Sequence, residues 1–240
     1  MSLGLLGDGF DLHCGGQDLR FPHHENERAQ AVALGREFAR HWMHNGFVVD
    51  AEGEKMSKSL GNVTNLLDLI EHYDPRAYRM LLLQTHYRSP VKVGQDNIDA
   101  AVKSLAGLDA FAARLATLGE AIPDEATLAS FRQVMDDDLD TPKATALIFD
   151  TVRRANAAVD ANDRTLAASL AAAVTTMCSA LGLELRTTSD VEDTAVELAR
   201  QLDAARAAKD FAEADRLRGE LQSAGYVVET TKDGTRVRRA

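Results

Sequence analysis

Residues 53–62 read Gly-Glu-Lys-Met-Ser-Lys-Ser-Leu-Gly-Asn and follow an apolar run at 46–49 that is typical of a strand. Glycines near both ends of the stretch let the backbone turn tightly and approach a ligand. Lys55 and Lys58 flank a Met-Ser pair, and a lysine ammonium is a compact charge with three donors that suits a phosphate. A solvated basic turn is the alternative for two lysines at this spacing. The stretch predicts a mobile loop that holds phosphate groups.

A second informative stretch lies between residues 10 and 35. Phe10–His13 alternates like a short strand, and the glycine pair at 15–16 is expected to turn the chain. Proline is favoured in the first turn of a helix, so a helix is predicted from near Pro22 to Gly35. His23 and Glu27 then share one helix face, and an imidazole and a carboxylate so placed suit zinc. A surface His–Glu hydrogen bond is the alternative that the spacing alone leaves open.

The order Lys-Met-Ser-Lys-Ser at 55–59 resembles the signature loop of class I aminoacyl-tRNA synthetases. In that family the loop closes over ATP, and the second lysine stabilises the pyrophosphate. The resemblance is closer still to the cysteinyl-tRNA synthetase family. It is carried by residues 11–27, which read Asp-Leu-His-Cys-Gly-Gly-Gln-Asp-Leu-Arg-Phe-Pro-His-His-Glu-Asn-Glu, and by Trp-Met-His-Asn-Gly at 42–46.

This resemblance implies a nucleotide site. Lys55 and Lys58 correspond to the catalytic lysines of the loop, and ATP is expected to enter with Mg²⁺. Lys58 also belongs to the expected ATP contacts, with Gly16, Asp18 and Gly46. Asp18 is expected to face the ribose.

The resemblance also implies a metal and a substrate pocket. His23 and Glu27 match two zinc ligands of the family, in which the metal takes the cysteine thiolate directly. Zinc prefers thiolate to hydroxyl, so such a site selects cysteine over serine. His13 is expected near the amino-acid pocket.

The family has features that this chain lacks. Two cysteine ligands and a His-Ile-Gly-His motif are expected upstream, and neither Cys14 nor Cys178 matches the missing ligands. Cys178 lies in an apolar helical pattern that is typical of core. The resemblance therefore implies a carboxy-terminal portion that lacks the amino-terminal half of the catalytic domain. Alone, it is not expected to activate cysteine.

The rest of the chain is predicted to be mostly helical. Three consecutive aspartates at 136–138 lack the spacing of a calcium loop and are expected to cap the helix that begins at Thr141. The fold class predicted is an α/β fragment of a Rossmann-like catalytic domain, followed by a mostly α-helical bundle and a small α+β anticodon-binding module. The predicted divisions are 1–63 (catalytic), 64–93 (connecting), 94–184 (bundle) and 190–240 (anticodon module).

The last division reads as two helices and a hairpin, with the turn at 232–234. By resemblance, Arg206, Phe211 and Asp215 contact or support the anticodon stem-loop of tRNA. Unstacked anticodon bases are read by their edges and by stacking. Val237 stands where the family usually has a tryptophan, which is a departure from the pattern.

Composition agrees with a soluble protein of 240 residues and net charge −10, without a membrane span. The two distant cysteines are typical of a reducing cytoplasm. The resemblance thus implies a cytoplasmic, monomeric ligase of the cysteinyl-tRNA synthetase family, with tRNA(Cys), cysteine and ATP as partners and one zinc ion per chain. Two alternatives stay open: the related ligase that joins cysteine to a glucosaminyl-inositol in mycothiol synthesis, and a non-catalytic tRNA-binding fragment.

Overall fold

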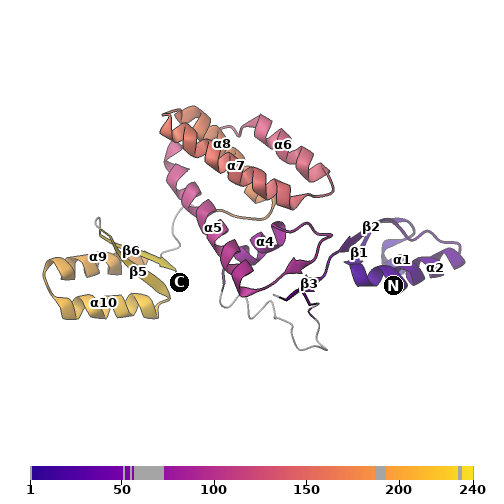
Figure 1. Cartoon of the computed structure of the whole chain (residues 1–240), viewed down its shortest axis with the longest axis horizontal. Coiled ribbons are helices and arrows are strands. Elements are labelled where there is room, and N and C mark those ends of the chain that lie inside the picture. The colour runs from indigo at the N-terminus through magenta and orange to yellow at the C-terminus, as the bar shows by residue number, and fades with distance from the viewer. Residues whose placement is uncertain are drawn as a thin grey trace.

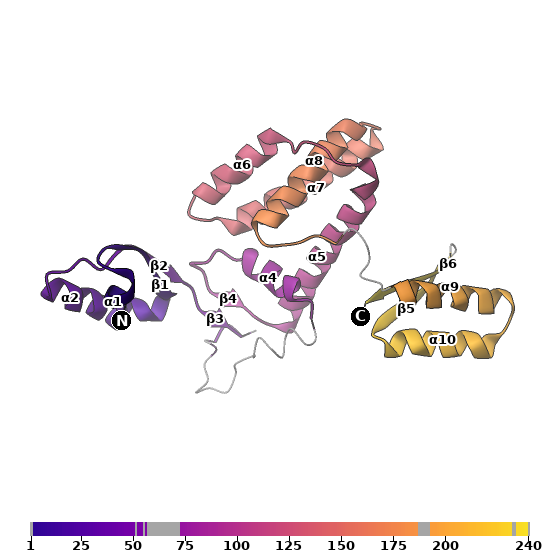
Figure 2. The ribbon, with the colours of Figure 1, turned by 180° about the vertical axis from the view of Figure 1, so that it is seen from behind.

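The structure is a computed structural model that describes residues 2–50, 52–54, 56, 73–186, 193–231 and 234–239. An amino-terminal α/β unit, a helical bundle and a carboxy-terminal module follow one another along the chain (Figures 1 and 2). Lys55 and Lys58, which the sequence predicts to hold the phosphates of ATP, lie outside the described residues.

Two parallel strands organise the amino-terminal unit. Its elements are α1 (Ser2–Leu6), β1 (Phe10–Gly16), a 3₁₀ turn (Gln17–Leu19), an irregular turn (Arg20–His24), α2 (Glu25–Ala33) and β2 (Ala39–Asn45). Strand β1 pairs with β2 in a register that sets Phe10 opposite Ala39 and Gly16 opposite Asn45. The connection through α2 is the crossover that parallel pairing requires.

Two local predictions for this unit were wrong. The glycine pair at 15–16 lies inside β1, and the turn follows it. The predicted helix begins at Glu25 and not near Pro22. Phe21 is extended, with φ −140° and ψ 134°, because a residue before proline is disfavoured from the helical region.

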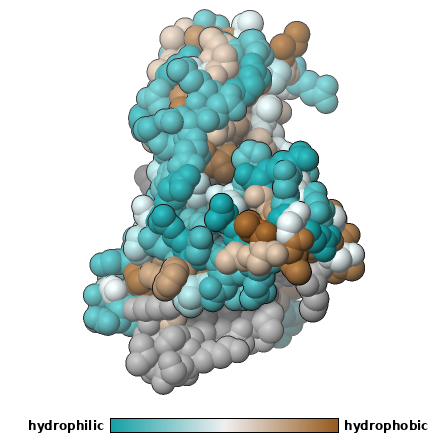
Figure 3. Space-filling model, turned by 90° about the vertical axis from the view of Figure 1, so that its right-hand side faces the viewer, coloured by the Kyte–Doolittle hydropathy of each residue, from teal (hydrophilic) through white to brown (hydrophobic). Residues whose placement is uncertain are grey.

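The unit exposes apolar side chains. Leu5, Phe21 and Leu34 are 83%, 75% and 73% exposed, and Figure 3, which faces this unit, shows hydrophobic atoms at its surface. Among the described residues, each of β1 and β2 has a single pairing partner. Parallel sheets are normally covered on both faces, so this surface has the character of an interface.

A short connection leads into the bundle. Strand β3 (Val48–Val49) pairs in parallel with β4 (Val91–Lys92), and α4 (Pro75–Leu83) precedes β4 in the chain. The Asp74 carboxylate accepts a hydrogen bond from the Arg76 backbone N–H and caps α4, and Pro75 stands in the first turn, where proline is favoured.

The bundle consists of α5 (Gln95–Leu115), α6 (Glu125–Asp136), α7 (Thr141–Asp160) and α8 (Arg164–Ala180), and α7 packs along α8. Leu108, Ile148, Leu170 and Met177 lie in its core and are at most 1% exposed. The predicted core position of Cys178 is confirmed, and burial raises the pKa of its thiol to about 12.

The carboxy-terminal module has a small core of its own. It contains α9 (Asp193–Ala207), α10 (Phe211–Ser223) and an antiparallel hairpin of β5 (Tyr226–Thr231) and β6 (Gly234–Arg239). Leu202, Leu217, Leu221 and Tyr226 pack between the helices and the hairpin. The helix–helix–hairpin prediction is confirmed. In the described part of the chain, no helix is both long enough and apolar enough to cross a bilayer.

Candidate functional site

A cluster of histidines and one carboxylate lies between β1 and α2. Strand β1 carries His13, whose ring meets Trp42 of β2 edge to face at 5.0 Å between ring centroids. The His13 Nε2 atom lies 3.0 Å from the Glu27 Oε2 atom of α2. The parallel register places His13 directly opposite Trp42, so the sheet fixes the ring that contacts the carboxylate.

The predicted zinc pair is brought together at longer range. The Nε2 atom of His23 lies 3.8 Å from Oε2 of Glu27, and His23 is 60% exposed. Glu27 stands in the first turn of α2, where a carboxylate is favoured by the helix dipole. Glu27 therefore faces His13 and His23 with the same oxygen.

His24 is a functional candidate that the sequence reasoning missed. It is 3% exposed, and its Nδ1 atom lies 2.9 Å from Nε2 of His44 at the end of β2, so one ring donates and the other accepts. Burial lowers the pKa of His24, and the neighbouring His13 and His44 lower it further. The signal available in the sequence was the adjacency of His24 to His23.

These side chains fit a metal ion. The nearest ligand atoms of His13, His24 and Glu27 all lie within 4.8 Å of one another. Two imidazole nitrogens and a carboxylate oxygen are donors that zinc accepts. His23 borders this group through Glu27 and stays a predicted ligand.

The two glycines at 15–16 lie tightly against neighbouring side chains. A Cβ on Gly15 would meet the His24 ring at 2.7 Å, and one on Gly16 would meet Oδ1 of Asp18 at 2.6 Å. Glycine at these positions lets His24 and the Asp18 carboxylate fold back over the end of β1. The structure thus brings Gly16 and Asp18 together beside the cluster, and their contacts with ATP stay a prediction.

Gly46 joins the unit to the segment before β4. Its N–H donates to the Tyr87 carbonyl at 2.7 Å, and a Cβ would stand 2.2 Å from the Ser89 carbonyl oxygen. This packing by itself demands glycine, whatever contact Gly46 makes with ATP.

A cavity of about 530 Å³ opens beside the histidines. It is lined by Gln17, Arg20, His24, Glu25, Arg28, Trp42, His44 and Arg88. The lining contains three arginines and the aromatic ring of Trp42. His24 belongs both to this lining and to the candidate metal ligands. Such a composition suits an anion that carries a planar ring.

The predicted tRNA residues all lie in the carboxy-terminal module. Arg206 ends α9 and donates through Nη1 to the Thr235 hydroxyl at 2.9 Å, which ties α9 to β6. Phe211 begins α10 and is 68% exposed, and Asp215 is exposed on the same helix. Arg206 therefore has a structural partner, while Phe211 presents a free ring to solvent.

Comparison with known proteins agrees with this architecture. The family model for the tRNA synthetases class I (C) catalytic domain matches residues 1–103, the DALR domain matches 130–186, and the cysteinyl-tRNA ligase anticodon binding domain matches 188–238. The Cysteine–tRNA ligase of Halorhodospira halophila is 44% identical over 250 residues, covering 100% of this chain and 54% of that protein. That of Kocuria rhizophila is 45% identical and covers 95% of this chain and 50% of its own length.

Solved structures show the same fold at low identity. The LeuRS of Agrobacterium radiobacter K84, in a ternary complex with tRNA and LeuAMS, is 18% identical with a TM-score of 0.55, over 72% of this chain and 25% of that chain. The methionyl-tRNA synthetase of Mycobacterium tuberculosis, bound by methionyl-adenylate, is 20% identical with a TM-score of 0.50, over 72% of this chain and 40% of that chain.

The fold and its site define a class I aminoacyl-tRNA synthetase catalytic portion with an attached bundle and anticodon-binding domain. Within this class, the chain belongs to the cysteinyl-tRNA synthetase family. It spans about half the length of the curated relatives that it matches.

Proposed function

We propose that this chain is the carboxy-terminal portion of a cysteine–tRNA ligase, which activates cysteine with ATP and transfers it to tRNA(Cys). The observation that carries the proposal is the 44% identity to a Cysteine–tRNA ligase over the whole of this chain. The family match at 188–238 favours a tRNA substrate over the glucosaminyl-inositol of the rival ligase, since that match is an anticodon-binding domain. The enzyme acts in the cytoplasm as a monomer.

The predicted site residues take these roles. Lys55 and Lys58 bind the phosphates of ATP and stabilise the pyrophosphate, and ATP arrives with Mg²⁺. The sharp approach that Gly16 permits sets the Asp18 carboxylate to accept from the ribose hydroxyls. Gly46 closes the same pocket from the end of β2.

The histidine cluster holds zinc in this proposal. Glu27 and His23 are ligands, and His13 and His24 stand close enough to complete or orient the set. A bound zinc ion supplies a preference for the cysteine thiolate over a hydroxyl. The hydrogen bond between His24 and His44 fixes the ring orientation of His24, as partners of metal-site histidines commonly do.

The carboxy-terminal module binds the anticodon stem-loop. Phe211 is exposed and offers a ring for stacking on an unstacked base. Arg206 supports the hairpin through Thr235, and Asp215 lies on α10 with Phe211. Phe211→Ala should weaken binding of a tRNA(Cys) transcript about fivefold or more, since stacking contributes about 1–3 kcal/mol per base.

Zinc analysis and pyrophosphate exchange test the proposal. We expect Glu27→Gln to remove zinc from the purified chain, while Glu25→Gln, on the same helix and 59% exposed at its side chain, keeps it. Cysteine-dependent ATP–pyrophosphate exchange should appear when this chain is co-expressed with the amino-terminal half of the Halorhodospira halophila relative, and Lys58→Ala should abolish it. Exchange that needs neither cysteine nor Lys58 would refute the proposed function.

A further inference from the structure

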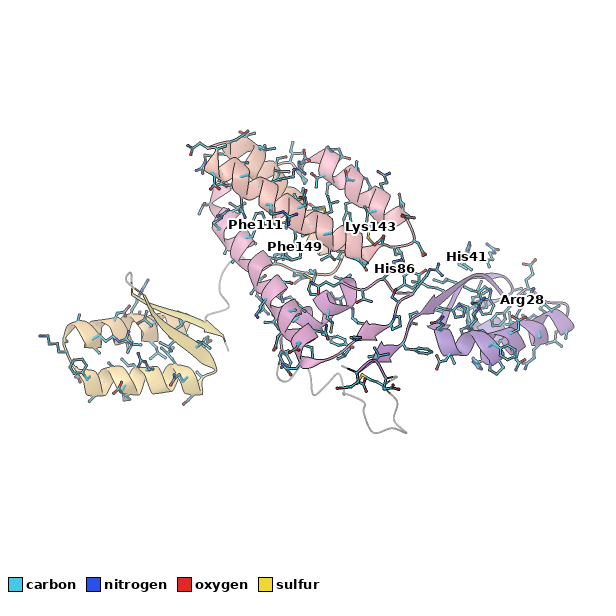
Figure 4. All side chains as sticks on the ribbon, viewed as in Figure 1. Arg28, His41, His86, Phe111, Lys143 and Phe149 are labelled. Carbon is cyan, nitrogen blue, oxygen red and sulfur yellow. The ribbon has the colours of Figure 1, made fainter. Side chains whose placement is uncertain are left out.

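We propose that Asp138 is a positioning residue that holds Arg88 at the rim of the cavity, where Arg88, Arg20 and Arg28 form a site for a phosphate attached to a nucleoside. The inference deepens the proposed function and rests on it for the reaction that such a ligand would enter. Asp138 lies in the turn between α6 and α7, whereas Arg88 lies between α4 and β4. Figure 4 shows the neighbouring His86 between Lys143 of the bundle and the amino-terminal unit.

Asp138 fixes the guanidinium of Arg88 in two directions. The Nε atom of Arg88 donates to Oδ2 of Asp138 at 2.6 Å, and Nη2 donates to Oδ1 at 2.8 Å, which is the bidentate geometry. The Tyr87 hydroxyl donates to the same Oδ1 at 2.8 Å. The Tyr87 ring also lies 5.0 Å from the guanidinium carbon, so a face and an edge of Arg88 are both held.

The backbone of the turn is arranged around this contact. Asp138 and the following Leu139 have φ values of 56° and 55°, which residues other than glycine rarely adopt. Such conformations persist when surrounding contacts determine them. The His86 ring supplies one such contact, because its Nε2 atom lies 3.2 Å from the Asp138 carbonyl oxygen. Hydrogen bonds from Arg88 and Tyr87 keep the pKa of Asp138 far below its usual range, so the carboxylate stays charged.

Arg88 also lines the cavity, and one of its terminal nitrogens is not held by Asp138. Its Nη1 atom has no acceptor among the described residues, and the residue lines the cavity with Arg20 and Arg28. Three guanidinium groups line the cavity with the single lining carboxylate of Glu25, so the lining carries more positive than negative formal charge.

The floor of the cavity suits a base. The rings of Trp42 and His44 are nearly parallel, 10° apart at 6.4 Å between centroids. Arginine matches phosphate in a fork, and flat rings accept any base by stacking. Phosphate and base together describe a nucleotide, either free or at the single-stranded end of an RNA.

Two probes distinguish these sources. Binding of N-methylanthraniloyl-ATP and of a fluorescein-labelled pentaribonucleotide to the 240-residue chain is measured by fluorescence anisotropy. For the probe that binds, Asp138→Asn should weaken the affinity about five- to tenfold, as loss of one charged contact does. The slope of log Kd against log salt should fall by about one, since one phosphate contact is lost. Asp137→Asn is the matched control, because Asp137 lies in the same turn and its carboxylate pairs with Lys143 at 3.7 Å.

A double-mutant cycle separates positioning from general stability. Arg88→Gln combined with Asp138→Asn should bind no more weakly than Arg88→Gln alone, and Asp138→Glu should restore part of the affinity. If Asp138→Asn does not fold by circular dichroism, Arg88→Lys tests the same claim, since lysine keeps the charge without the fork. Unchanged affinity in Asp138→Asn or Arg88→Lys, or no binding of either probe to the parent chain, would overturn the inference. Failure of pyrophosphate exchange alone would overturn the proposed function and leave this binding result standing.

Discussion

Arg76 forms a brace that joins the connecting helix α4 to the bundle, and Arg76→Ala is the sharpest test of the stability of this junction. Its Nη2 atom lies 2.8 Å from Oδ2 of Asp74 and 2.9 Å from Oδ2 of Asp109, while Nη1 donates to Oδ1 of Asp109 at 3.0 Å and to the Glu184 carbonyl at 2.6 Å. The brace thus ties α4, α5 and the segment after α8. The pKa of Arg76 is raised: burial opposes the charge, but the hydrogen bonds that Arg76 donates to Asp109 and Asp74 outweigh it.

The cost of removing the guanidinium follows from the burial of its partners. Arg76 is 14% exposed, and the Asp74 and Asp109 side chains are 23% and 22% exposed. Breaking a buried pair costs about 3–5 kcal/mol, and partial exposure lowers the expectation to about 2–3 kcal/mol. Arg186 remains 2.8 Å from Asp74 and limits the loss. For a protein of this size the change should lower Tm by about 4–12 °C.

Urea unfolding followed by circular dichroism at 222 nm measures this cost, because the bundle dominates the helical signal. Arg153→Ala is the control, since Arg153 pairs with Asp150 at 3.0 Å on the surface and should cost less than about 0.5 kcal/mol. Fluorescence of Trp42, the single tryptophan, reports the amino-terminal unit and should keep its own midpoint. If Arg76→Ala costs no more than Arg153→Ala, the reasoning on the brace is wrong.

Three further predictions use other parts of the fold. Gly46→Ala should destabilise the chain by about 1–3 kcal/mol in urea, because its Cβ would meet backbone at 2.2 Å, whereas Gly107→Ala, in open space on α5, should stabilise by about 0.5–1 kcal/mol. Leu170→Ala, at 0% exposure, should cost about 2–5 kcal/mol, and Leu166→Ala, 42% exposed, less than about 1 kcal/mol. Burial acts to raise the pKa of Asp74, but hydrogen bonds from the neighbouring arginine lower it below the usual 3.8. The contribution of the Asp74 carboxylate to stability is therefore full above pH 3.8 and is lost as the pH falls through the pKa of Asp74 in the folded protein. Over this pH range the urea midpoint should fall less in Asp74→Asn than in the parent.

Local patterns sufficed for the elements that are held by neighbours in the chain. The bundle helices follow from apolar residues three and four apart, such as Leu108, Phe111 and Leu115, all of which are buried. The hairpin follows from alternating strands around a glycine turn. The start of α2 could not be predicted in this way, because the extended Phe21 before Pro22 moved it to Glu25.

The candidate site was predictable only where its residues lie close together in the sequence. His23 and Glu27 are four residues apart, and the structure places their nearest atoms 3.8 Å apart. The contacts of His24 with His44 and of His13 with Glu27 span 20 and 14 residues. They depend on the parallel register of β1 and β2, which no local spacing encodes.

The acidic turn at 136–140 shows why a local explanation can find the right segment and the wrong residues. The sequence predicts that the three aspartates at 136–138 cap the next helix, but the cap is Asp140, which accepts from the Lys143 backbone N–H at 3.1 Å. Asp138, two residues earlier, turns the other way and binds Arg88, fifty residues distant in the chain. Capping needs only the helix that follows, but the choice of Asp138 requires that the segment before β4 already packs on Gly46. The contact between the bundle and the catalytic portion therefore depends on tertiary packing. The partner of Asp138 is Arg88, and nothing in the run of aspartates at 136–138 indicates that partner.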